Sequence, residues 1–276
     1  MIRASVGKKC VLGLFLVILT GVYTQGQSNC SARNLRGSFG FSITGTIINT
    51  GVDCAINGRF ATDPQGKISG TLTESAGGQV MRTPFNGSYT VNPDCTGSIN
   101  FKFPNGLAVG SAFVMSGYGS KMYFMNSDDA STVPVSVVDA GTIRKQYHWG
   151  GHALDKCSAA SFQGKFALVL SGTKVASKTL FVTSGLLAAD GKGQITGNAT
   201  ESIAGHVSKG PLKGNYKIRP DCTGTGTIET PSHATQAFDF VVVGDGDEVF
   251  LIGTDDGIQQ TGTATKQRLG TTTIGK

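Results

Sequence analysis

Residues 86–98 read NGSYTVNPDCTGS, and residues 213–225 read KGNYKIRPDCTGT. The second stretch lies 127 positions after the first (213 against 86), and CSARNLRGSFGF at Cys30 is answered by CSAASFQGKFAL at Cys157 at the same distance. Each repeated unit is about 110 to 120 residues long, whereas solenoid and propeller repeats run roughly 20 to 50 residues. The chain is therefore expected to contain two copies of one complete domain.

The ends of the two units set the expected domain boundaries. The alignment runs without a gap until a six-residue surplus in STVPVSVVDA, after which GTIRKQ at Gly141 aligns with GTATKQ at Gly262. The segment 147–156 (YHWGGHALDK) has no repeat partner and contains Gly150-Gly151, as a linker does. We predict a first repeat over 27–146, a linker over 147–156 and a second repeat over 157–276. One barrel built from two intertwined halves is the alternative.

The first 26 residues resemble an export signal. Arg3, Lys8 and Lys9 precede an almost wholly apolar run over 10–23, which is shorter than a membrane-spanning helix requires. A signal peptide over 1–26 predicts a secreted or periplasmic protein. Its removal lowers the formal net charge from +6 to +3, because it carries three basic residues and no acid. The remaining basic residues are scattered, so we expect no nucleic-acid partner, and no membrane partner after cleavage.

The composition indicates an all-β chain. Gly contributes 40 of the 276 residues, about twice the average share of about 7%. Charged residues make up only 15% of the chain, against an average of about 25%. Short runs in which every second residue is apolar, such as Phe39, Phe41 and Ile43, alternate with turn residues, as in antiparallel barrels and sandwiches. We predict two tandem antiparallel up-and-down β-barrels of about eight strands each. A pair of β-sandwiches is the alternative, although an immunoglobulin sandwich would place a Trp between its cysteines and Trp149 lies in the linker.

The cysteines follow the duplication. Cys30 and Cys95 are separated by the same number of residues as Cys157 and Cys222, which predicts one disulfide within each unit. Such bridges form in oxidising compartments. Cys54 has no counterpart, because Phe181 occupies the equivalent position. An apolar equivalent predicts that Cys54 is a buried, reduced and inert thiol.

The repeated motif Tyr-x-Val/Ile-x-Pro-Asp-Cys-Thr-Gly, at residues 89–97 and 216–224, carries a resemblance. It resembles a signature of uncharacterised secreted bacterial proteins whose barrel is similar to that of allene oxide cyclase. The resemblance covers both units and implies a barrel fold, but no particular activity. Asp94 and Asp221 within the motif are expected to hydrogen-bond their own turn backbone.

Motifs for common enzyme chemistries are absent from the sequence. It contains no Walker loop, His-Glu-x-x-His, Cys-x-x-Cys or Gly-x-Ser-x-Gly motif, and no histidine is repeated between the units. We predict no catalytic residue, no metal and no cofactor. His148 and His152 could be a metal pair, but they are interpreted as part of a flexible linker because Gly-Gly between them breaks any helix that would align the rings.

An eight-stranded barrel is either filled by its own side chains or holds one small ligand. The leading hypothesis is therefore a two-barrel protein that binds a small apolar or amphipathic ligand. The alternatives are a structural or interaction module with solid barrels, and an isomerase or cyclase of the allene oxide cyclase type.

Strand parity selects the candidate ligand-binding residues. Glu74 and Glu201 share parity with apolar neighbours on their strands, and Tyr89 and Tyr216 do the same. These four residues would supply the few polar groups that orient a ligand in an apolar interior. The competing interpretation places both carboxylates in solvent at strand ends and lets both tyrosines fill the core with their hydroxyls at the rim.

Overall fold

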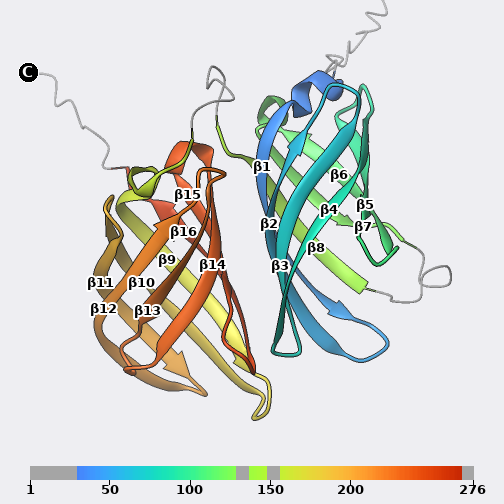
Figure 1. Cartoon of the computed structure of the whole chain (residues 1–276). Helices are drawn as coiled ribbons and strands as arrows, with labels where there is room; N and C mark the ends of the chain where they lie inside the picture. The colour runs from blue at the N-terminus through green and yellow to red at the C-terminus, as the bar shows by residue number, and fades with distance from the viewer. Residues whose placement is uncertain (1–29, 129–136, 148–155, 269–276) are drawn as a thin grey trace, which may run out of the picture.

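Two closed eight-stranded antiparallel β-barrels lie side by side in the computed structural model, which describes residues 30–128, 137–147 and 156–268 (Figure 1). The predicted fold class is confirmed. The intertwined barrel and the sandwich pair are wrong, because each set of eight strands closes on itself. The predicted signal peptide, and all of the predicted linker except Tyr147 and Lys156, lie outside the described residues.

In the first barrel every strand pairs with the next one along the chain, and β1 pairs with β8 to close the sheet. Its strands are β1 (Gly37–Ile47), β2 (Val52–Thr62), β3 (Lys67–Ala76), β4 (Gln79–Val91), β5 (Thr96–Lys102), β6 (Ala108–Ser116), β7 (Lys121–Asn126) and β8 (Val137–Lys145). Two short 3₁₀ helices accompany them, η1 (Ala32–Leu35) and η2 (Gly117–Gly119).

The second barrel repeats this order, and β9 pairs with β16 to close it. Its strands are β9 (Gln163–Lys174), β10 (Thr179–Asp190), β11 (Gln194–Ile203), β12 (His206–Ile218), β13 (Thr223–Glu229), β14 (Thr235–Val243), β15 (Glu248–Gly253) and β16 (Ile258–Lys266). The matching 3₁₀ helices are η3 (Ala159–Ser161) and η4 (Gly244–Gly246).

The duplicated Pro-Asp-Cys-Thr-Gly motif forms the turn between β4 and β5 and, in the second barrel, between β12 and β13. Asp94 Oδ1 accepts hydrogen bonds from the backbone N–H and the hydroxyl of Thr96, at 3.0 and 2.7 Å, and these bonds lower the pKa of Asp94. Asp221 holds Thr223 with the same two distances. Both aspartates therefore bond their own turn, as expected from the sequence, and the motif is structural.

One end of each barrel is closed by the segment before its first strand. Disulfides join Cys30 to Cys95 and Cys157 to Cys222, as predicted, and tie this segment to the motif turn. Below the turn the core is aromatic: the rings of Phe39 and Phe60 stack with centroids 5.4 Å apart. This end of the first barrel, near the blue helix η1 in Figure 1, is filled by packed apolar side chains.

The barrels contact each other through outer faces of β1 to β3 and β14 to β16. Val241, Val243 and Phe250 form an apolar cluster on the outside of the second barrel. Gly40 of β1 lies against this cluster so closely that a Cβ there would come within 2.5 Å of the Val243 side chain. The missing side chain at Gly40 therefore allows the two sheets to approach.

Polar bonds add to the junction between the barrels. Asp239 accepts hydrogen bonds from Arg82 Nε at 2.7 Å, from Arg82 Nη2 at 3.1 Å and from the Thr73 hydroxyl at 2.8 Å. Arg144 pairs with Glu248. At the far end of the barrels, the backbone N–H of Gly257 donates to the carbonyl of Gly78 at 2.8 Å.

Candidate functional site

The first barrel contains a cavity of about 320 Å³ at the end opposite η1. Its walls are mainly apolar, and a small number of polar side chains face it. The apolar lining includes Phe41, Ile43, Ile56, Leu72, Phe101, Phe103, Leu107, Val109 and Phe124. The polar lining includes Cys54, Glu74, Thr83, Asn105, Ser111, Asn126, Asp128 and Asp139.

Three of the polar groups are brought together by strand register. Cys54 on β2 lies directly opposite Gly45 on β1, and Gly45 lies directly opposite Asp139 on β8. Gly45 has no side chain, and Asp139 packs over it: a Cβ on Gly45 would come within 2.5 Å of Asp139 Cβ. Glu74 on β3 lies opposite Ile56, two residues from Cys54 on the same face of the sheet.

The second barrel is filled at the equivalent end, where a void of only about 10 Å³ remains. Phe181 replaces Cys54, and its ring lies over Gly172, the counterpart of Gly45; a Cβ on Gly172 would come within 2.6 Å of that ring. Phe238 replaces Ser111 and is 6% exposed. Two aromatic rings thus occupy space that the first barrel leaves open.

The two duplicated glutamates have different surroundings. Glu201 is 1% exposed and accepts hydrogen bonds from the Thr183 hydroxyl at 3.4 Å, the Thr230 hydroxyl at 3.2 Å and the Ser232 backbone at 3.2 Å. In the first barrel Ile56 and Phe103 replace the two threonines. Glu74 accordingly accepts no hydrogen bond from the part of the chain that the structure describes.

Asp139 differs from its counterpart in the same way. In the second barrel this position is Gln260, whose side chain donates to Gln236 at 3.0 Å. Burial raises the pKa of Asp139 to about 6, against an opposing hydrogen bond from the Asn126 backbone, and the negative charge of Asp128 raises it further. Burial also raises the pKa of Glu74. The cavity therefore holds two carboxyl groups in surroundings that disfavour their charged forms.

Cys54 is buried and forms no disulfide in the described chain. Burial, followed by the charges of Asp139, Glu74 and Asp53, raises the pKa of its thiol to about 12. The thiol is thus protonated at neutral pH, and a protonated thiol is a poor nucleophile. Cys54 lines the cavity as a small, weakly polar surface.

Of the four predicted ligand-binding residues, the structure places only Glu74 on the cavity. Tyr89 and Tyr216 point inward but lie at the closed ends. Tyr89 donates its hydroxyl to the carbonyl of Asp63 at 2.8 Å, with Ala32 O at 3.3 Å. Tyr216 bonds the carbonyls of Phe162 at 2.8 Å and Ala159 at 3.0 Å. Burial raises the pKa of both phenols. The tyrosines and glutamates are therefore not brought together.

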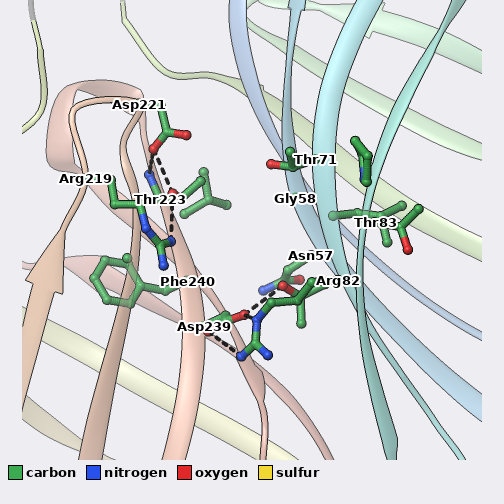
Figure 2. Close-up of a pocket in the computed structure, with 15 residues that line it drawn as sticks. Asn57, Gly58, Thr71, Arg82, Thr83, Arg219, Asp221, Thr223, Asp239 and Phe240 are labelled. Carbon is green, nitrogen blue, oxygen red and sulfur yellow. Dashed lines mark hydrogen bonds and ion pairs between the residues drawn. The ribbon is translucent and has the colours of Figure 1, made fainter. Parts of the chain in front are cut away.

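A second cavity, of about 380 Å³, lies between the barrels (Figure 2). Arg82 pairs with Asp239, and the Thr223 hydroxyl accepts a hydrogen bond from Arg219 and donates one to Asp221. The amide of Asn57 faces this cavity without a partner in the described residues. Because the ion pair of Arg82 with Asp239 spans both barrels, this cavity belongs to the junction.

Sequence reasoning missed Asp139 and the difference between the open first barrel and the filled second one. Asp139 lies beyond the register shift, so alignment at the main offset does not pair it with Gln260. The sequence did contain a signal for the open barrel at Cys54 and Ser111, because each of these small residues aligns with a phenylalanine in the other repeat.

The comparisons with known proteins give only distant structural likenesses. No protein-family model matches the chain, and no curated protein matches it. Among solved structures, it is similar to a redesigned β-barrel, mFAP1, bound to DFHBI (13% identity, TM-score 0.30, 42% of this chain and 98% of that one). It is also similar to a protein of unknown function of the DUF3598 family from Nostoc punctiforme (9%, 0.25, 88% and 100%). A third is transferrin binding protein B from Haemophilus parasuis (8%, 0.31, 84% and 76%).

Within the described ranges, no group of three or more His, Cys, Asp or Glu side chains is placed to hold a metal ion. In the same ranges, no helix has the length and apolar character needed to cross a membrane.

Proposed function

We propose that the protein is a secreted or periplasmic binding protein that holds one small, largely apolar ligand in its first barrel. The observation that carries the proposal is the contrast between two copies of one fold: about 320 Å³ is open in the first and about 10 Å³ in the second. Ligand pockets generally measure roughly 300 to 1,000 Å³ and combine apolar walls with a few polar groups. The cavity corresponds to a small ligand.

The second barrel has a supporting role in this proposal. Its core is filled by Phe181 and Phe238, and its outer face holds the first barrel through the junction described above. The solid-module alternative describes this barrel well, but it leaves the first cavity without a purpose. The two disulfides and the N-terminal apolar run support an extracytoplasmic location.

Filling the first cavity tests the function directly. The double substitution Cys54→Phe/Ser111→Phe introduces the two rings that the second barrel carries at these positions. The matched control is Ala112→Phe, which adds a ring to the exposed outer face beside Ser111. Binding is measured by titrating the purified full chain with a small neutral naphthalene dye, prodan, whose fluorescence shifts in apolar surroundings.

The wild type and Ala112→Phe are expected to bind the dye, and the double variant to bind it at least about tenfold more weakly. Circular dichroism checks that each variant keeps its β structure. Equal binding by the wild type and the filled variant would contradict the proposal. Native mass spectrometry of protein from its own host then identifies the passenger, and recovery of that compound unchanged after incubation favours binding over an isomerase or cyclase activity.

A further inference from the structure

The cavity of the first barrel has an unbalanced set of charges. Glu74, Asp128 and Asp139 line it, and no Lys, Arg or His is among the described residues of its wall. Asp128 is engaged, because its Oδ2 accepts the Gly110 backbone N–H at 2.8 Å. Glu74 has no such donor. The described wall therefore carries acidic groups and no basic side chain to balance them.

The second barrel shows how the same fold neutralises these positions. There the glutamate is surrounded by two threonine hydroxyls and a backbone N–H, and the aspartate is replaced by an uncharged glutamine. The first barrel retains both carboxyl groups and replaces the threonines by Ile56 and Phe103. Both carboxyl groups are half-buried, and withdrawing a carboxylate from water without a compensating positive charge is destabilising. A ligand that brings the missing positive charge would offset that cost.

The shape of the cavity places this charge. Asp139 packs over Gly45, which lies between it and Cys54 in the sheet, and Glu74 lines the same end of the cavity from β3. Phe41, Phe101, Phe103 and Phe124 form the walls beyond it. Aromatic faces attract organic cations, whereas a metal ion such as Ca²⁺ requires six to eight oxygen ligands, and no metal-binding group of three occurs in the described residues.

We infer that the first barrel selects ligands with an organic ammonium group, which lies between Glu74 and Asp139 while the apolar remainder packs against the phenylalanines. This inference rests on the ligand-binding function proposed above. It names the chemical class of the ligand as an amphipathic amine or quaternary ammonium compound.

A pair of isosteric ligands isolates the charge. Benzyltrimethylammonium and neopentylbenzene have the same shape, with nitrogen in the first where the second has carbon. Each is titrated against the prodan complex of the full chain, and the concentration that displaces half of the dye is compared. The variant is Glu74→Gln/Asp139→Asn. The matched control is Asp53→Asn, which removes an exposed carboxylate on the same strand as Cys54.

In the wild type and in Asp53→Asn, the cation is expected to displace the dye at a concentration about tenfold or more below that of the neutral isostere. In the double variant this preference disappears, while the neutral compound still binds. Equal displacement by both compounds in the wild type, displacement by neither, or a preference that survives in the double variant would overturn the inference and leave the binding function standing. A wild type that binds neither the dye nor either compound overturns the binding function itself.

Discussion

Cys54 and Phe181 occupy the same position in the two copies of the fold, and the difference in their volumes, together with that between Ser111 and Phe238, leaves the first barrel open and the second filled. Phe181 covers Gly172 with its ring. Cys54 borders the open cavity of the first barrel, which Asp139 and Glu74 also line. The stability and the titration behaviour of the two barrels are expected to differ accordingly.

Removing the ring of Phe181 should destabilise the protein far more than removing the thiol of Cys54. Phe181→Ala opens a cavity in a filled core, and such substitutions cost about 3 to 5 kcal/mol. Cys54→Ala removes one sulfur atom that already borders open space, so the expected cost is about 1 kcal/mol or less. Urea unfolding monitored by circular dichroism measures both. Similar losses for the two variants would contradict the assignment of filled and open barrels.

The hydroxyls of Tyr89 and Tyr216 are expected to stabilise the closed ends and to have no part in ligand binding. Tyr89→Phe and Tyr216→Phe each remove a hydrogen bond to backbone carbonyls near the 3₁₀ helices, which costs about 1 kcal/mol. Tyr123→Phe is the control, since Tyr123 is exposed. Thermal unfolding and dye titration are run in parallel. A tenfold loss of dye affinity in Tyr89→Phe with unchanged stability would place that hydroxyl in the binding site instead.

Asp139 should make stability depend on pH in a defined direction. Its folded pKa is about 6 and its ordinary value is 3.8, so the folded chain holds this proton more tightly than the unfolded chain. The free energy of unfolding therefore falls as pH rises between these two values. Asp139→Asn removes this contribution. The variant should match the wild type near pH 4 and exceed it near pH 7 by on the order of 1 kcal/mol, after allowance for solvent contact.

The measurement for this prediction is a series of urea unfolding curves at intervals of pH, with Asp53→Asn as control. A difference between Asp139→Asn and the wild type that is the same at both ends of the range would show that Asp139 titrates normally.

The carboxyl group of Asp139 also gives an expectation for ligand binding. Affinity for benzyltrimethylammonium should rise as the pH is raised through about 6, because ionisation creates the charge that pairs with it.

The pair of Arg82 with Asp239 is expected to couple the unfolding of the two barrels. The Arg82 side chain is 58% exposed, so its removal in Arg82→Ala should cost about 1 kcal/mol or less. Asp239→Ala removes the acceptor for both Arg82 and Thr73 and should weaken the junction further. Differential scanning calorimetry should then show two separate transitions. Arg36→Ala, at an exposed position, is the control. A single unchanged transition in Asp239→Ala would mean that apolar contacts alone hold the junction.

Much of the fold follows from the sequence, because the duplication gives the domain count and alternation gives the strands. Parity also assigns Glu74 and Glu201 correctly to the interior. It fails for the tyrosines as partners of the glutamates, since a period of two residues gives the face of a strand but not the height along the barrel axis. The cavity depends on which side chains meet in one layer, and Ser111 and Cys54 come from strands that are far apart in the sequence.

The hydrogen bond between Gly257 and Gly78 has a mechanical consequence. Gly78 belongs to the turn between β3 and β4, only four residues after Glu74. The second barrel thereby anchors the β3–β4 hairpin of the first barrel, because an outward movement of this hairpin would break the bond. The second barrel thus anchors the open end of the first barrel from outside, next to the strand that carries Glu74.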